Sequence, residues 1–213
     1  MFRTTLLLSC AFALCGCSAV RIELEYLPEP TVLPLLAGKT FSLAVTDQRH
    51  YVTSGPKAPK YLGHTKGSLG VVYSYSTSDQ AALVEHVRRD LSRDLQSLGM
   101  IEDVRAPSVR LNVRLYDWNF DAGIHGRFWY DAHVAVDADP GQPIANIVVK
   151  GEQAIEGQWG DPARLKVEDE IPGFYEQFIR KLVRENPEVI AALAQARPAN
   201  QDGTAALLPR PGP

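Results

Sequence analysis

Residue types that carry enzyme or metal chemistry are present in this chain, but their spacing does not suit it. The five histidines include no pair four residues apart and no His-Glu-x-x-His frame, the spacings that hold zinc on one helix face. The stretch 63–70 lacks the strand-to-helix context of a phosphate-binding loop, and no Gly-x-Ser-x-Gly elbow occurs. We therefore expect no metal site, no cofactor and no enzymatic activity. A hydrolase stays open only if the fold brings His64 or His133 next to a serine and a carboxylate.

The three cysteines all stand within the first seventeen residues, in a segment typical of a secretory signal. Arg3 is the only charged residue before Arg21, and the apolar run from Leu6 to Leu14 has the length and composition of a signal's hydrophobic region. This run is too short to cross a bilayer as a helix, which takes about 20 apolar residues. We expect residues 1–16 to be a signal peptide that is removed from the mature chain.

The end of the apolar run, LCGC at 14–17, resembles the lipobox of bacterial lipoprotein precursors. The resemblance implies that Cys17 becomes the lipidated first residue of the mature chain, while Cys10 and Cys15 leave with the signal. In such lipoproteins an aspartate after the lipidated cysteine marks retention in the inner membrane, and here Ser18 follows. The resemblance therefore implies an outer-membrane lipoprotein with its body in the periplasm and no free thiol. A plain secretion signal, with a soluble product, is the alternative.

Composition places the rest of the chain among ordinary globular proteins. Hydrophobic residues make up 45% and charged residues 22%, and the net charge of −3 is too weak to attract nucleic acid. Residues 39–196 are enough for a single periplasmic domain with its own core. Because prolines at 28, 30 and 34 favour extended chain, we expect residues 17–38 to be the lipidated cysteine and an extended tether. The proline-rich residues 197–213 are expected to be a disordered tail.

Hydrophobic periodicity divides the domain into strands and helices. Period-two alternation predicts strands, and apolar residues at steps of three or four predict helices. The expected strands lie at 40–47, 69–75, 108–115, 128–137 and 144–157, and the expected helices at 79–98, 171–183 and 187–196, with a polar loop over 48–68. Ser78 and Asn186 are expected N-caps, and Gly99 is an expected helix end. This order predicts an α+β two-layer sandwich, with a mostly antiparallel sheet and helices on one face.

Two aromatic stretches, 116–120 and 127–130, flank a turn-like segment and are expected to face one another across a hairpin. One interpretation is a surface patch that binds a partner protein. Its members would be Trp118, Phe120, Arg127, Trp129 and Tyr130. The other interpretation, which we favour, is that alternate residues enter the core while the polar tips of Trp and Tyr find hydrogen bonds. Joint exposure of Trp118 and Trp129 would decide for the patch.

Several short motifs make the chain similar to the YajG family of bacterial lipoproteins. Asp47 and Arg49 follow the first expected strand, Leu62-Gly63 comes later, and the long helix ends in a second Leu-Gly pair. The lipobox and the prolines after it complete the resemblance. That family offers no established catalytic residues, so the resemblance implies an uncharacterised envelope lipoprotein rather than an enzyme. From the residues alone, we expect Asp47 and Arg49 to form a structural salt bridge rather than a ligand site.

The sequence thus predicts a non-enzymatic, outer-membrane-anchored lipoprotein whose periplasmic domain binds a partner or takes part in envelope assembly. The alternative is an accessory lipoprotein subunit of an envelope transport or secretion complex. The expected partners are the membrane, through the N-terminal lipid, and a protein of the envelope, but not nucleic acid. The sequence leaves the oligomeric state open.

Overall fold

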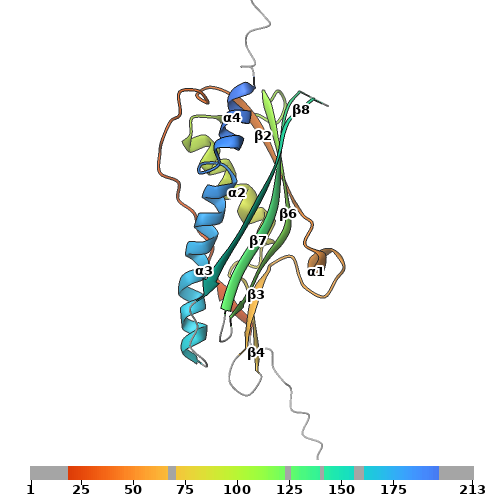
Figure 1. Cartoon of the computed structure of the whole chain (residues 1–213), viewed down its shortest axis with the longest axis vertical. Coiled ribbons are helices and arrows are strands. Elements are labelled where there is room, and N and C mark those ends of the chain that lie inside the picture. The colour runs from red at the N-terminus through yellow and green to blue at the C-terminus, as the bar shows by residue number, and fades with distance from the viewer. Residues whose placement is uncertain (1–18, 67–70, 123–125, 140–141, 156–160, 197–213) are drawn as a thin grey trace, which may run out of the picture.

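A mixed eight-stranded sheet forms one layer of the described structure, and helices form the other (Figure 1). The computed structural model describes residues 19–66, 71–122, 126–139, 142–155 and 161–196. The strands are β1 (Ala19–Ile22), β2 (Thr40–Asp47), β3 (Tyr61–Lys66), β4 (Val72–Thr77), β5 (Ile101–Glu102), β6 (Val109–Ala122), β7 (Gly126–Asp139) and β8 (Gln142–Ile155). The helices are α1 (His50–Thr53), α2 (Leu83–Ser97), α3 (Asp161–Leu182) and α4 (Pro187–Gln195).

Two long antiparallel ladders form one side of the sheet. β6, β7 and β8 run as the predicted meander, with β7 between the other two. On its other edge β6 pairs in parallel with β2 at its start and with β3 at its end. β5 joins β2, while β4 joins β3 and β1 joins β4. β1 therefore reaches the sheet through a parallel pairing with a strand far along the chain.

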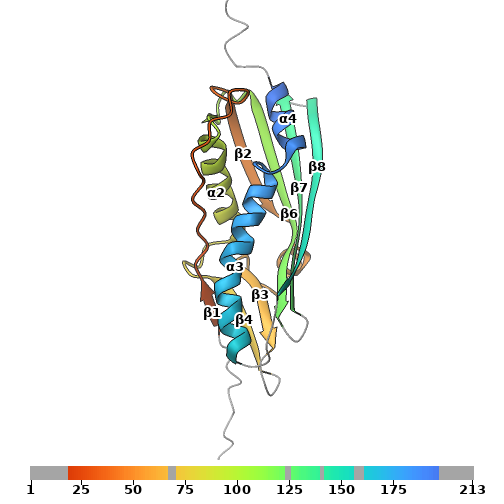
Figure 2. The same cartoon turned by 60° about the vertical axis from the view of Figure 1, so that its left-hand side comes forward.

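The large helices α2, α3 and α4 cover one face of the sheet, as predicted (Figures 1 and 2). The short helix α1 lies beside the opposite face, which we call the outer face (Figure 1). The domain is elongated, with β1 at one end of its long axis and α4 at the other (Figure 2). The α+β two-layer architecture therefore agrees with the expectation from the sequence.

Strand β6 shows how the sequence selects the core face. The odd-numbered residues from Val109 to Leu115 are buried, and the residues between them are polar or exposed. A bulge between Leu115 and Asp117 then changes the phase of the alternation. Tyr116 keeps the exposed position that the alternation gives it, whereas the bulge moves Trp118 into the core.

Helix α2 begins later than expected. Its N-cap is Ala82, and Ser78 lies outside the helix. The turn before it explains the shift, because the Asp79 carboxylate accepts a hydrogen bond from a backbone N–H two residues on (3.1 Å) and Gln80 has a φ of 66°. The end of the helix is as predicted, since Gly99 adopts a φ of 96°, which favours glycine.

The segment before β2 contains no helix and ends in a turn at 34–38, and it is not a free tether from residue 19 onward. Ile22, Leu24 and Tyr26 are each 3% exposed. The backbone N–H groups of Thr31 and Leu33 donate to carbonyls at the end of α2. The alternating sequence RIELEY explains the packing, because it places every second, apolar side chain on one face. Residues 23–38, which we call the strap, therefore belong to the domain, while residues 1–18 and 197–213 lie outside the described part.

Two other element boundaries differ from the expectation. The expected loop 48–68 contains α1 and β3, because Tyr61 and Leu62 are buried and Tyr61 pairs with β4. Helix α3 begins at Asp161, well before the expected start, and continues through Pro172 because Val167 extends its buried stripe. Within the described ranges, no helix is both long and apolar enough to span a membrane.

Candidate functional site

The aromatic cluster divides between the two faces of the sheet, so the expected five-residue patch does not form. Trp118 and Phe120 have no exposed surface, and Tyr130 is 4% exposed. The centre of the Trp118 ring system lies 5.1 Å from that of Phe178 in α3 and 4.7 Å from that of Phe128. These side chains therefore stabilise the packing of α3 on the sheet, which is the core interpretation of the sequence pattern.

Trp129 and Arg127 lie on the outer face, where they line a shallow groove of about 440 Å³ that we call the Trp129 groove. Tyr130, although nearly buried, also lines this groove, so three of the five expected residues meet there. The other charged lining residues are Asp117, Asp131, Lys150 and Glu152. The Arg127 guanidinium lies 4.8 Å from the centre of the Trp129 ring, and the indole N–H donates to Asp117 at 2.8 Å. The indole is thus held between a cation and a carboxylate.

The charges of the Trp129 groove pair with one another on the solvent side of the sheet. The Lys150 ammonium lies 2.8 Å from Asp131, and Arg127 lies 3.5 Å from Glu152. The Arg127 and Lys150 side chains are 60% and 63% exposed, so each pair contributes only about 0–1 kcal/mol. A partner with its own charges can therefore replace these pairs at little cost. The described residues that line the groove include no serine, threonine or cysteine.

His64 and His133 each face a carboxylate. His133 Nε2 lies 3.5 Å from Asp131, and His64 Nε2 lies 3.8 Å from Asp121. His64 Nδ1 is also 3.2 Å from the Tyr61 hydroxyl. Among the hydrogen bonds of the described residues, none joins either histidine to a serine, so these residues assemble no Ser-His-carboxylate set. In the same part of the chain, no three His, Cys, Asp or Glu side chains gather as metal ligands.

Protonation of His64 is expected to destabilise the fold. Burial lowers the pKa of His64 below its ordinary value of 6.5, although Asp121 opposes the shift. Because the unfolded chain binds this proton more tightly, the free energy of unfolding should fall as pH falls from about 6.5 through the folded-state pKa. Urea unfolding of the wild type and of His64→Gln across this range measures the effect, since the variant should lose part of the slope. A His64 pKa at or above 6.5 in an NMR titration would contradict it.

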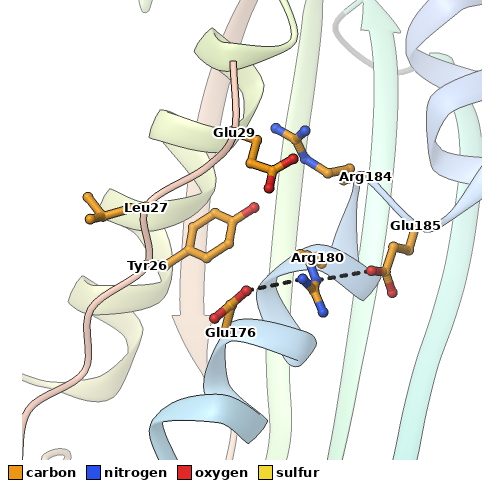
Figure 3. Close-up of a pocket in the computed structure, with 7 residues that line it drawn as sticks. All are labelled: Tyr26, Leu27, Glu29, Glu176, Arg180, Arg184 and Glu185. Atoms are coloured by element: carbon orange, nitrogen blue, oxygen red, sulfur yellow. Dashed lines mark hydrogen bonds and ion pairs between the residues drawn. The ribbon is translucent and has the colours of Figure 1, made fainter. Parts of the chain in front are cut away.

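A second cavity, of about 280 Å³, lies where the strap passes the end of α3 (Figure 3). It is lined by Tyr26, Leu27, Glu29, Glu176, Arg180, Arg184 and Glu185. Arg180 lies between two carboxylates, at 3.1 Å from Glu176 and 3.0 Å from Glu185 (Figure 3). Its charge is therefore already balanced within the protein.

Beside this cavity, Asp94 of α2 joins the strap to the segment after α3. The Asp94 carboxylate has no exposed surface and accepts hydrogen bonds from the Tyr26 hydroxyl at 2.8 Å and from Arg184 Nε at 3.0 Å. Burial raises the pKa of Asp94, and the bonds from Tyr26 and Arg184 oppose that shift. One turn earlier, Asp90 accepts a hydrogen bond from the Tyr175 hydroxyl at 2.8 Å. Two buried carboxylates of α2 thus fix the strap and α3, so the cavity marks a structural joint.

Asp47 and Arg49 form the expected structural salt bridge. Arg49 has no exposed surface, and its guanidinium makes two bonds to the Asp47 carboxylate, at 2.7 and 2.9 Å. The same group donates to the carbonyl oxygens of Pro59, at 2.7 Å, and Tyr61, at 2.8 Å. Arg49 therefore fastens the loop after α1 to the end of β2.

The structure also brings together cations to which the sequence analysis assigned no role. Arg21 of β1 and Lys57 and Lys60 of the loop before β3 line one pocket of about 230 Å³, which we call the basic pocket. The two segments are far apart in sequence and meet only through the parallel pairing of β1 with β4. The basic composition of the loop was the only signal available in the sequence.

No family model and no curated protein matches the chain. Its fold is similar to that of protein XCC0632 from Xanthomonas campestris, of family DUF330, with 8% identity, 76% of this chain and 92% of that chain covered and a TM-score of 0.49. It is also similar to the hypothetical protein CT253 from Chlamydia trachomatis, with 9% identity, 75% and 98% coverage and a TM-score of 0.46. Lipoprotein GNA1162 from Neisseria meningitidis matches with 6% identity, 64% and 97% coverage and a TM-score of 0.29. At these values we draw no functional conclusion from the likeness.

Proposed function

We propose that the chain is a lipid-anchored envelope protein without catalytic activity, which binds a protein partner through the outer face of its sheet. One observation carries the proposal: the large helices cover one face of the sheet (Figure 1), while the outer face carries the Trp129 groove. Tryptophan and arginine are enriched among the residues that contribute most to protein interfaces, and a polar rim around such residues is typical. Tyr116 and Val148, which are 37% and 52% exposed, extend the apolar surface of this face.

The proposed anchor is lipidated Cys17, at the end of a signal peptide of residues 1–16, and it rests on the sequence because Cys17 lies outside the described residues. The distance between this anchor and the domain follows from β1, which begins at Ala19 and is paired within the sheet. Two residues of chain span at most about 7 Å. A lipid on Cys17 would therefore keep the β1 end of the domain close to the bilayer and direct the α4 end away from it (Figure 2). The proposed location on the periplasmic side of the outer membrane rests on Ser18.

The residues behind the YajG-like resemblance have structural roles in this chain. Asp47 and Arg49 fasten a loop, and Gly63 allows close packing of Phe120. Because these residues serve the structure rather than a reaction, their roles fit a lipoprotein family without catalytic residues. We propose that the chain belongs to such a family. The alternative is that the partner is a transporter or secretion machine, with this chain as its accessory lipoprotein subunit.

Photo-cross-linking in intact cells tests the proposed function. A photoreactive residue in place of Val148 on the outer face is expected to link the chain to one identified envelope protein, because an interface there would bury that side chain. Val104, which is 75% exposed in the loop after β5, provides the matched control and should give no such adduct. Cys17→Ala is expected to release the chain from the membrane fraction and to remove the adduct at Val148.

The outcomes separate the parts of the proposal. Equal adducts at Val148 and Val104, or none at either, would contradict partner binding through the outer face. A Cys17→Ala chain that still pellets with the outer membrane would contradict the lipid anchor. A transporter or secretion subunit as the linked protein would favour the accessory-subunit alternative.

A further inference from the structure

The basic pocket lies on the outer face near the β1 end, between β1, β4 and the loop after α1. Neighbouring residues of two parallel strands form its floor, since Ala19 pairs with Ser74 and Arg21 pairs with Ser76. Tyr75, between the two serines, has no exposed surface and points into the core. Because side chains alternate along a strand, Ser74 and Ser76 present their hydroxyls to the outer face and the pocket.

The lining of the basic pocket carries three positive charges and no carboxylate. The cations are Arg21, Lys57 and Lys60, and none of the described lining residues is Asp or Glu. The whole chain has a net charge of −3, so this local excess does not follow from the composition. In the Trp129 groove and in the cavity beside the strap, by contrast, cations face carboxylates of the same protein. Unbalanced positive charge in a hollow attracts anions.

Contacts within the protein position the two lysines of the basic pocket. The Lys57 ammonium lies 4.6 Å from the centre of the Tyr61 ring, and the Lys60 ammonium donates to the side-chain oxygen of Gln80. Gln80 has a φ of 66°, a strained conformation that surrounding contacts must hold. Buried Arg49 also holds this loop, because its guanidinium donates hydrogen bonds to the carbonyl oxygens of Pro59 and Tyr61. A ligand therefore meets donors that have already lost much of their conformational freedom.

Phosphate is the anion that these donors suit best. Ammonium and guanidinium groups make short, charge-assisted hydrogen bonds to phosphate oxygens, and a guanidinium can bind two of them at once. Serine hydroxyls add neutral donors on the floor. Pro56 and Ala58 line the same pocket and offer apolar surface beside the charges. This combination fits a phosphate that is joined to a less polar group.

We infer that the basic pocket binds the phosphate of an anionic phospholipid headgroup. The choice of a lipid rests on the proposed anchor, because Ala19 and Arg21 follow Cys17 by two and four residues and so lie within about 7 and 14 Å of it along the chain. A lipidated Cys17 thus holds the pocket at the depth of the headgroups. The pocket gives the domain a second contact with the membrane, which fixes its orientation about the anchor.

Hydrogen exchange of the full-length, lipidated protein in phospholipid nanodiscs tests this inference. Exchange of residues 56–61 is compared in phosphatidylcholine discs, in discs that contain phosphatidylglycerol, and in phosphatidylcholine discs with added inorganic phosphate. Binding at about ten times the dissociation constant should slow local exchange about tenfold. The double variant Lys57→Gln/Lys60→Gln should lose this slowing, whereas Arg127→Gln/Lys150→Gln, on the same face, should keep it. Unchanged exchange in α2 verifies that each variant is folded.

Each outcome decides a separate claim. No slowing by either phosphate source, or slowing that persists in Lys57→Gln/Lys60→Gln, would overturn the phosphate site. Slowing by inorganic phosphate but not by phosphatidylglycerol would support the site and overturn the lipid as its ligand. The mass of the mature N-terminus reports lipidation independently, so failure of the anchor is distinguishable from failure of the pocket.

Discussion

Replacement of Arg49 by methionine is expected to lower the free energy of unfolding by about 3–5 kcal/mol, the usual cost of removing one partner of a buried ion pair. Arg49 has no exposed surface, and its loss leaves the Asp47 carboxylate without its bidentate partner. The carbonyl oxygens of Pro59 and Tyr61 would also lose their donor. Equilibrium unfolding in urea, followed by circular dichroism, measures the change.

Two further variants test whether the cost comes from the buried charge. Arg127→Met removes an exposed arginine that lies 3.5 Å from a carboxylate, and it should cost less than about 1 kcal/mol. The double variant Asp47→Leu/Arg49→Met removes both charges and should recover part of the loss, because no unpaired charge is left in the interior. A loss at Arg49 no larger than at Arg127 would show that the salt bridge does not hold the loop.

The spacing of apolar residues was sufficient to predict the helices and strands that bury one regular stripe or face. The stripe of α2 and the proline after Asn186 predicted two helices correctly, and Asn186 does cap α4 through hydrogen bonds at 3.1 and 3.2 Å. The same approach predicted the order of the meander and the Asp47–Arg49 pair. In each case the determining residues lie close together in sequence, so their spacing along the chain is enough to predict the structure.

The strap shows why proline content alone predicted a tether wrongly. Pro28, Pro30 and Pro34 favour extended chain, and residues 23–33 contain no helix, but a segment without a helix can also pack. Ile22, Leu24 and Tyr26 determine its position, because α2 and the sheet provide a buried surface for their side chains. The alternation in RIELEY was a local signal for one buried face, but proline content alone could not reveal it.

The aromatic cluster shows the limit of strict alternation. From Val109 to Leu115 the odd-numbered residues are buried, and uninterrupted alternation would place Trp118 on the outer face. The bulge between Leu115 and Asp117 reverses the phase, so Trp118 enters the core while Trp129 of β7 lies on the outer face. Nothing in the local pattern specified this bulge. The bulge therefore places Trp118 in the core, on the opposite side of the sheet from the proposed partner surface.

The basic pocket could not be predicted for a different reason. Its cations and hydroxyls come from β1, β4 and the loop before β3. Parallel pairing of β1 with β4 brings them together. Hydrogen bonds from Arg49 to the carbonyl oxygens of Pro59 and Tyr61 hold the loop in position. Long-range pairing between short strands leaves no periodic signal in the sequence. The proposed partner surface and the proposed lipid contact thus both lie on the outer face. There, strand pairing brings together exposed side chains that are distant in sequence.

Gly63→Ala is expected to destabilise the domain by up to about 3 kcal/mol, the upper part of the range for an overpacked core. A Cβ atom at Gly63 would lie 2.4 Å from Cδ1 of Phe120. That ring has no exposed surface and lies against Tyr75, with 5.1 Å between ring centres, so it cannot move away freely. Urea unfolding measures the loss, and Phe120→Leu in the same chain should recover part of it by making room.

Gly173→Ala provides the matched control for this substitution. Nothing lies within 4 Å of a Cβ atom at Gly173, which stands inside α3. Alanine should therefore stabilise the protein by about 0.5–1 kcal/mol, because glycine loses more backbone entropy in a helix. The two substitutions add the same methyl group and should shift the free energy of unfolding in opposite directions. If both were neutral, close packing of β3 on Phe120 would not be the reason for glycine at position 63, and the Leu62-Gly63 pair would need another role.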